Sequence, residues 1–215
     1  YNIDINESSL KRENLKRLIA KMRSDSFGLE MPEGFIPYIG NWRNITPKTY
    51  RKFEAFEHTD SQFKNRINFP IRDAGNKIIC FQGRDYTMTE KAKYKFWPPN
   101  ISPPMHPQPK PLQGRVILVE GIFDMLNLHQ NGLTNTVCCF GAKNFKEKHL
   151  DLFKVSGVMG IDVLFDPDKA GREAANSVKE LCTGFPVRVV NLKNGDPGDM
   201  SEKQIKGLRK ALYSS

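Results

Sequence analysis

The sequence predicts an α/β protein in which a mainly parallel sheet with flanking helices follows a smaller α+β basic subdomain. Three observations predict this fold class: apolar runs alternate with helical patterns from residue 115 on, a hairpin pattern lies within residues 66–84, and a proline-rich stretch separates the two regions. Alternating strands and helices with right-handed crossovers produce a parallel sheet whose two faces are covered by helices.

Two helices are expected in the first half. Residues 8–23 carry apolar side chains at near-helical spacing between basic ones, which predicts an amphipathic helix with a cationic polar face. Thr46 and Pro47 suit the N-cap and the first position of a short second helix. The buried stripe of that helix is expected to be Tyr50, Phe53 and Phe56.

An antiparallel hairpin is expected after these helices. Residues 66–72 and 77–84 have the composition of strands and flank a turn-forming cluster at 73–76. Pro70 has no N–H to donate, so its strand is expected to lie at an edge or to contain a bulge there.

Residues 98–111 contain seven prolines and form the best domain boundary, because such a stretch cannot hold a helix or a central strand. We therefore expect a basic subdomain over 1–110, a parallel α/β domain over 111–200 and a C-terminal helix over 201–215. Beyond the boundary, strands are expected at 115–119, 136–140, 158–165 and 186–192, and helices at 121–131, 145–155, 170–182 and 202–212.

The 215-residue chain is basic, with 33 Lys and Arg against 24 Asp and Glu and a net charge of +9. Residues 1–110 hold 19 basic and 12 acidic side chains, whereas residues 111–215 hold 14 and 12. A basic half is typical of proteins that meet nucleic acid or nucleotide phosphates, and also of chains whose charges are simply solvated. No apolar run approaches the roughly 18 residues of a membrane span, so we expect no membrane partner.

Two further features bear on the compartment. The chain begins without Met, a basic segment or an apolar segment, so we expect no signal peptide and an internal fragment of a longer cytoplasmic protein. The four cysteines form no C-x-x-C pair, so the sequence supports neither a zinc knuckle nor a disulfide framework. They are Cys80, Cys138, Cys139 and Cys182.

Acidic residues follow three of the expected strands of the second half. Because the carboxyl ends of parallel strands meet at one edge of the sheet, where ligands bind at the topological switch point, we expect these side chains to converge. The first cluster is Glu120 and Asp124, the second is Asp166 and Asp168, and the third is Asp196 and Asp199.

Carboxylates at such close quarters raise each other's pKa unless a hard cation compensates their charge. Oxygen ligands without nearby His or Cys favour Mg²⁺ or Mn²⁺ over zinc, with water and a substrate phosphate as the other ligands. Phosphoryl or nucleotidyl transfer is the chemistry that suits such a site. The alternative is that these residues cap helices or lie in solvated loops.

These residues carry a resemblance to a known family. Glu120-Gly121, the pair Asp166-x-Asp168 with Ala170-Gly171-Arg172 behind it, and the loop Gly195-Asp196-Pro197 resemble the TOPRIM domain of primases, topoisomerases and some nucleases. Upstream, three segments resemble the basic subdomain that precedes TOPRIM in the DnaG-type primases of bacteria and phages. They are Phe69-Pro70-Ile71-Arg72-Asp73, Phe81-Gln82-Gly83-Arg84 and Lys93-Tyr94.

The resemblance implies a primase catalytic core that makes short RNA primers from ribonucleoside triphosphates on single-stranded DNA by metal-dependent nucleotidyl transfer. It implies that Glu120, Asp166 and Asp168 are catalytic and hold two or more Mg²⁺ or Mn²⁺ ions. Asp124, Asp196 and Asp199 would assist. The family's last loop usually has the sequence Asp-Pro-Asp, whereas this chain has Asp196-Pro197-Gly198-Asp199.

The resemblance also implies which residues bind the template or the nucleotide. Residues 61–110 carry nine basic and three acidic side chains, and such a cluster can neutralise phosphates. The family's Gly-Thr segment is here Gly141-Ala142-Lys143-Asn144, so a lysine takes the place of a hydroxyl contact. The expected binding residues are Arg72, Arg84, Lys93, Lys95 and Lys143.

The family's zinc module and helicase-binding segment are not seen in this sequence. We therefore expect the catalytic core only, a monomer that reaches a replicative helicase through regions absent from this sequence, in the cytoplasm of the host if a phage encodes it.

Three rival functions stay open: a TOPRIM nuclease or topoisomerase fragment, a haloacid-dehalogenase-like phosphatase with Asp166 as nucleophile, and a non-catalytic module that binds single-stranded DNA.

Overall fold

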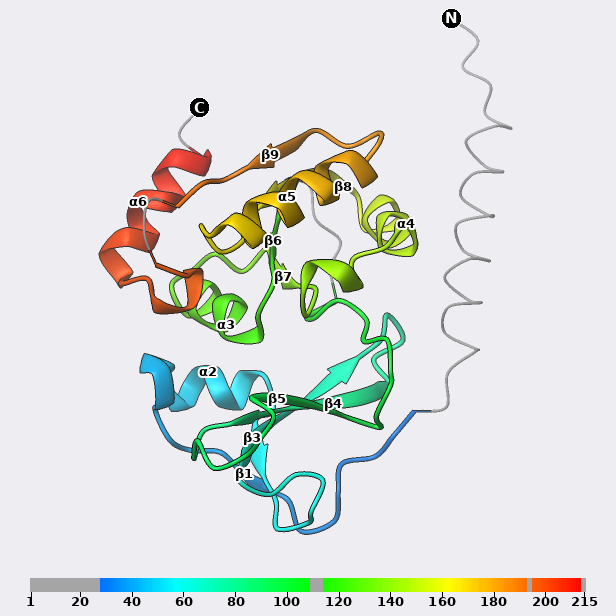
Figure 1. Ribbon diagram of the computed structural model, residues 1–215, viewed down its shortest axis with the longest axis vertical. Helices are drawn as coiled ribbons and strands as arrows, with labels where there is room; N and C mark the ends of the chain where they lie inside the picture. The colour runs from blue at the N-terminus through cyan, green and yellow to red at the C-terminus, as the bar shows by residue number, and fades with distance from the viewer. Residues whose placement is uncertain (1–27, 109–113, 193–194, 214–215) are drawn as a thin grey trace, which may run out of the picture.

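The computed structural model describes residues 28–108, 114–192 and 195–213 (Figure 1). The helix expected over residues 8–23 lies outside the described residues. None of the helices in the described part of the chain is both long enough and apolar enough to cross a membrane.

The first half forms a five-stranded antiparallel sheet in the order β1-β2-β3-β4-β5. The expected hairpin is confirmed as β3 and β4, and β2 pairs with β3 at Asn68. Pro70 lies beyond that pairing, next to a bulge between Ile71 and Arg72, as its missing N–H predicts. The strands are β1 (Ile36–Pro37), β2 (Phe56–Glu57), β3 (Arg66–Arg72), β4 (Ile78–Asp85) and β5 (Tyr94–Trp97).

One short helix, α2 (Pro47–Lys52), packs beside this sheet. The expected cap is confirmed, because the Thr46 side chain accepts a hydrogen bond from the Thr49 N–H and Pro47 opens the helix. The expectation that Phe56 lies on this helix is wrong. The backbone of Glu54 takes a φ of +55°, which a helix cannot hold, and Phe56 is part of β2.

The second half forms a four-stranded parallel sheet in the order β7-β6-β8-β9, and the α/β prediction is confirmed. The strands are β6 (Gly114–Val119), β7 (Thr136–Cys138), β8 (Val158–Val163) and β9 (Val187–Val189). The helices are α3 (Ile122–Gln130), α4 (Glu147–Val155), α5 (Lys169–Leu181) and α6 (Glu202–Tyr213).

The helices cover both faces of the parallel sheet, as predicted. Apolar residues of α3 and α6 share one buried cluster with Ile117 and Val119 of β6. Residues of α4 and α5 share another cluster with Val116 and Leu118, which point to the opposite face because side chains alternate along a strand.

A single buried cluster also joins the two sheets. Phe69 and Cys80, on the inner face of the antiparallel sheet, belong to the same cluster as Ile117 and Phe123. The rings of Phe69 and Phe123 lie 5.9 Å apart, edge to face. The antiparallel sheet therefore packs against α3 and one face of the parallel sheet, below them in the view of Figure 1.

The only charged residue within the sequence of β8 is Asp162, and it is fully buried. Arg115 of β6 and Arg188 of β9 donate hydrogen bonds to its carboxylate at 2.8 and 2.9 Å. A buried carboxylate needs such partners, so this group locks the three neighbouring strands in register.

Candidate active site

The candidate site lies at the carboxyl edge of the parallel sheet. The chain leaves β6 and β8 toward opposite sides, since β7 lies on one flank and β9 on the other, and this makes the gap between them the topological switch point. Glu120 directly follows β6, and Asp166 follows β8. A cavity of about 320 Å³ opens here, and we call it the acidic cavity.

Both halves of the chain line the acidic cavity. Its parallel-sheet side carries four carboxylates that come from all three of the sequence-predicted clusters: Glu120, Asp124, Asp166 and Asp196. Its other side carries polar and aromatic groups from the first half, which include Arg43, Gln82, Lys93, Tyr94 and Phe96.

The carboxylates disturb one another's ionisation. Burial raises the pKa of Asp124 to about 7, and the charge of Asp196 adds to this rise. The pKa of Asp166 is also raised, by desolvation first and then by the charges of Asp196 and Asp168. Desolvation, Asp166 and Asp168 raise the pKa of Glu120 in turn, although a hydrogen bond from the Ala142 N–H opposes this. The cavity therefore favours a species that brings positive charge.

Asp124 is held rigidly at the start of α3. Its Oδ2 accepts a hydrogen bond from the Gly121 N–H at 2.9 Å, and its side chain is enclosed by the loop that contains Gly198. A Cβ at Gly198 would lie 2.8 Å from Asp124 Oδ1, so the loop can approach only because this residue is glycine.

Two predicted acidic residues do not line the acidic cavity, and each has a local role. Asp168 caps α5, because its Oδ1 accepts a hydrogen bond from the Gly171 N–H at 2.7 Å. Asp199 is exposed and accepts a hydrogen bond from Arg43 at 2.6 Å. Asp196 lines the cavity and also caps the short helix η3 (Pro197–Asp199). Capping, the alternative considered from the sequence, thus accompanies the acidic clustering rather than replacing it.

The oxygen donors of the acidic cavity suit a hard cation that needs only a few protein ligands. Within the described residues, no three His, Cys, Asp or Glu side chains are close enough together to hold a metal ion. The cavity nevertheless offers several oxygen donors whose charges oppose one another, and Mg²⁺ commonly takes only one or two protein carboxylates with water and phosphate. A site completed by a phosphate-bearing ligand suits this arrangement.

The predicted basic residues are divided between the acidic cavity and the rest of the surface. Lys93 lines the cavity, and its charge partly offsets the rise in the pKa of Asp166. The Arg84 guanidinium lies over the rings of Tyr94 and Trp42, at 4.7 and 5.2 Å, and its Nε and Nη1 are buried without a hydrogen-bond partner. These two donors next to the cavity are suited to an anion.

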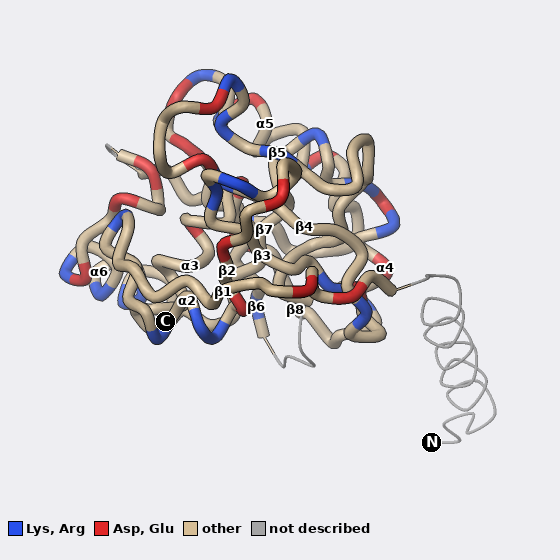
Figure 2. The backbone as a smooth tube through the Cα atoms, turned by 90° about the horizontal axis from the view of Figure 1, so that it is seen from below, with Lys and Arg blue, Asp and Glu red and all other residues tan. Residues whose placement is uncertain are grey.

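Arg72, Lys95 and Lys143 lie outside the acidic cavity. Arg72 donates two hydrogen bonds to the Glu54 carboxylate, at 2.7 and 3.0 Å, and lines a different cavity. Lys95 is exposed on β5, and Lys143 is exposed on the short helix η2 (Ala142–Asn144). In the view of Figure 2, Lys and Arg positions are spread around the molecule rather than gathered on one face.

Sequence reasoning missed two residues of the site. Arg43, at a kink with a φ of +54° in the short helix η1 (Trp42–Asn44), pairs with Asp196 at 3.4 Å and with Asp199 at 2.6 Å. No local pattern marks a contact between residues so far apart in the chain. Gln82 lies within the motif Phe81-Gln82-Gly83-Arg84, and that motif is the signal that could have singled it out.

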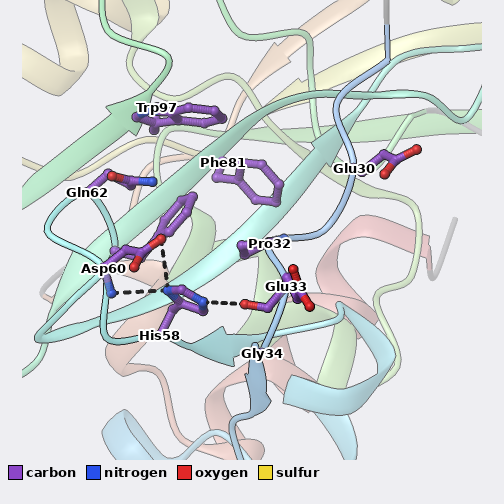
Figure 3. A pocket seen from close by; sticks show the side chains of 10 residues that line it. Glu30, Pro32, Glu33, Gly34, His58, Asp60, Gln62, Phe81 and Trp97 are labelled. Carbon is purple, nitrogen blue, oxygen red and sulfur yellow. Dashed lines mark hydrogen bonds and ion pairs between the residues drawn. The ribbon is translucent and has the colours of Figure 1, made fainter.

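A second cavity, of about 520 Å³, lies on the outer side of the antiparallel sheet (Figure 3). Glu30, Glu33 and Asp60 lie around it, with Phe81 and Trp97 as aromatic walls. Its His58 ring is held by the Glu33 carbonyl and the Asp60 N–H, at 2.7 and 3.1 Å. Since none of these described lining residues holds a buried polar atom without a partner, this cavity is a weaker candidate than the acidic one.

Two family models match this chain, one in each half. Residues 117–203 match the model of the Toprim-like family, and residues 49–99 match that of the N-terminal domain of the DNA primase catalytic core. The acidic residues lie in the first match, and Gln82, Arg84 and Lys93 lie in the second.

Curated DNA primases match over about two thirds of this chain. That of Pseudomonas putida is 32% identical over 155 residues, which cover 64% of this chain and 23% of the relative. That of Deinococcus radiodurans is 30% identical over 164 residues, which cover 70% and 28%. The chain thus spans about a quarter of the length of these curated relatives. Among solved structures, the zinc-binding and RNA polymerase domains of the Aquifex aeolicus primase match with a TM-score of 0.70 and 26% identity, over 80% of this chain and 54% of that one.

Proposed function

Since this chain is a DnaG-type primase core with a TOPRIM domain, we propose that it joins ribonucleoside triphosphates into short RNA primers on a single-stranded DNA template. The observation that carries the proposal is the convergence of four carboxylates from three strand ends with cationic groups of the antiparallel sheet in one cavity. Nucleotidyl transfer needs both kinds of group.

The carboxylates are proposed to hold the cation that the reaction requires. Glu120 and Asp166 are the best ligands, because both line the acidic cavity and the pKa of each is raised there. A cation would compensate the negative charges that contribute to these rises. Asp168 contributes through the carboxylate oxygen that does not cap α5. Held by these residues, Mg²⁺ or Mn²⁺ would help to activate the primer hydroxyl and would compensate charge on the pyrophosphate leaving group.

The antiparallel sheet is proposed to hold the triphosphate. Arg84 keeps two unpaired N–H donors beside the cavity, and stacking between two rings fixes its orientation. Lys93 adds a mobile charge, and Arg43 holds the loop of Asp196 against the site. These groups orient the phosphates toward the carboxylates. Such positioning, together with electrostatic stabilisation, supplies most of the catalysis in phosphoryl transfer.

The template is proposed to be single-stranded DNA. A DnaG primase catalytic domain whose structure is solved with bound ssDNA has the same fold, with a TM-score of 0.58 and 21% identity. Backbone phosphate contacts by exposed Lys and Arg carry no sequence information, so the core would bind templates with little base preference. Contact with a replicative helicase would need regions beyond these 215 residues.

The test is incubation with ssDNA, labelled ribonucleotides and Mg²⁺ or Mn²⁺, followed by gel electrophoresis. We expect metal-dependent primer synthesis by the wild type, and a loss of about 100-fold or more in Glu120→Gln and Asp166→Asn, because each loses a negative charge that the cation needs. Asp151→Asn, which neutralises an exposed carboxylate on α4, is the matched control and should keep full activity.

The same gel separates the rival functions. Shortened DNA would indicate a nuclease or topoisomerase, and a shifted but unchanged DNA band without products would indicate a binding module. Release of inorganic phosphate through a phospho-aspartate at Asp166 would indicate a phosphatase. Each of these outcomes, in place of synthesis, contradicts the proposal.

A further inference from the structure

Gln82 is a buried amide that the proposed chemistry does not yet use. Its side chain lies on β4, lines the acidic cavity and is only 5% exposed. Its Oε1 is buried and has no hydrogen-bond partner. Because a buried polar atom without a partner destabilises the protein, a ligand that supplies the missing bond would recover that loss.

The neighbours of Gln82 place it at the aromatic end of the cavity. It pairs with Phe96 of β5, whereas Arg84 pairs with Tyr94 two residues further along the same two strands. Phe96 packs edge to face on Phe140 at 5.4 Å, and both rings line the cavity. Two residues along a strand span about 6.6 Å, so a ligand with phosphates near Arg84 extends toward Gln82.

The chemistry of the amide selects the part of a nucleotide that it can contact. Ionised phosphates only accept hydrogen bonds, so they cannot satisfy an amide oxygen. Base edges differ among the four nucleotides, and a template-directed enzyme must admit all four at one position. Ribose hydroxyls are common to all four nucleotides and both donate and accept. Rotation of the carboxamide exchanges its oxygen and nitrogen, so it can meet a hydroxyl in either way.

We propose that Gln82 binds the ribose 2′-hydroxyl of the incoming nucleotide, the one hydroxyl that a deoxyribonucleotide lacks, and thereby makes the site prefer ribonucleotides. This inference rests on the proposed function, because it takes the nucleotide to lie between the carboxylates and the antiparallel sheet. It assigns Gln82 a role in specificity and none in the bond-making step.

The test is an equilibrium binding measurement with Mg²⁺ and three probes: ATP, 2′-deoxy-ATP and 3′-deoxy-ATP. For the wild type, loss of the 2′-hydroxyl in 2′-deoxy-ATP should weaken binding about two- to tenfold, the effect of one hydrogen bond. In Gln82→Met, which keeps the side-chain volume, ATP should bind as weakly as that deoxy analogue, and the difference between the two should vanish. Gln62→Met, at a glutamine outside the acidic cavity, should keep the wild-type difference.

Two results would overturn the inference. One is equal affinity of the wild type for ATP and 2′-deoxy-ATP, a measurement that needs no variant and so does not depend on the folding of Gln82→Met. The other is that Gln82→Met loses as much affinity as the wild type when ATP is replaced by 2′-deoxy-ATP. If its affinity for Mg²⁺ falls at the same time, the amide is a metal ligand and not a ribose contact.

The binding measurement is also independent of primer synthesis. Suppose that the wild type makes no primer and still binds 2′-deoxy-ATP more weakly than ATP, with that difference absent in Gln82→Met. This result would support the inference and contradict the proposed function. Primer synthesis together with equal binding of ATP and 2′-deoxy-ATP does the reverse.

Discussion

Asp124 shows how one enclosed side chain ties the stability of the protein to its ligand. It is 8% exposed, and among the described residues its carboxylate accepts a hydrogen bond from one backbone N–H, that of Gly121, so its ionised form is poorly compensated. Its pKa is raised to about 7, chiefly by desolvation and next by the charge of Asp196. The Asp124 carboxyl is therefore stabilised by protonation or, in its ionised form, by a cation in the cavity.

This raised pKa has a defined effect on stability. Between the ordinary carboxyl pKa and about 7, the folded protein binds more protons at Asp124 than the unfolded chain does, so the free energy of unfolding should decrease as the pH rises through that range. Thermal unfolding in metal-free buffer should show Asp124→Asn gaining stability over the wild type at pH 8 and less at pH 5.

Added Mg²⁺ provides the control for this prediction. It should raise the melting temperature of the wild type at pH 8 more than that of Asp124→Asn, because the asparagine variant has less charge to compensate. A stability difference between the two proteins that is independent of pH would mean that Asp124 titrates normally in the folded state.

At the scale of elements, the approach of α5 to the end of β8 decides where Asp166 lies. Gly171, in the first turn of α5, is buried, and a Cβ there would lie 2.2 Å from the backbone oxygen of Asp166. The Asp168 cap fixes the same turn from the other side. The helix and the loop that carries Asp166 are thus in contact at a position where only glycine fits.

Gly171→Ala is therefore expected to destabilise the protein, although alanine favours helices. The clash with backbone should cost about 1–3 kcal/mol, as overpacking of an interior does, and should move Asp166 and reduce primer synthesis. Denaturant unfolding and the primer assay measure the two effects.

Gly207→Ala on α6 is the matched control, because a Cβ there meets nothing within 4 Å. It should leave synthesis intact and add up to about 1 kcal/mol of stability through helix propensity. Equal behaviour of the two alanine variants would show that the approach of α5 to Asp166 is not tight.

At the scale of the whole molecule, the two sheets share one core, and the acidic cavity exists only where they meet. The buried cluster that holds Phe69 and Phe123 runs from the antiparallel sheet through α3 to α6. Trp42 packs on Phe123 with ring centroids 5.1 Å apart, so a tryptophan of the first half reports on this junction.

We expect this shared core to make the described parts of the two halves unfold together. Denaturant transitions followed by tryptophan fluorescence and by far-ultraviolet circular dichroism should coincide. Phe123→Ala should shift both by the same amount, with a loss of about 3–5 kcal/mol for a fully buried phenylalanine. Tyr213→Ala, at a half-exposed residue near the end of α6, should shift both far less. Two separated transitions would mean that the halves are stable independently.

Local patterns were sufficient for most of the elements. The alternation of apolar runs and helical segments predicted the parallel sheet and its four helices to within a few residues, because periodicity reports directly on which face is buried. Thr46-Pro47 and the turn cluster at 73–76 predicted α2 and the β3–β4 hairpin through backbone chemistry alone. The two-residue strands β1 and β2 escaped prediction because two residues show no period, and β5 did so because its aromatic residues also suit a packed loop.

The amino-acid sequence by itself determined that acidic residues follow three parallel strands, and topology alone then brings those strand ends to one edge. Only the tertiary structure decided which side chains face them. Arg43 and Gln82 reach the acidic cavity, and Arg72 pairs with Glu54 elsewhere, because the register and packing of the antiparallel sheet against α3 set their positions. Such contacts join residues that are distant in the chain, as Arg43 and Asp196 are, and depend on how two separate sheets pack, which no local pattern encodes.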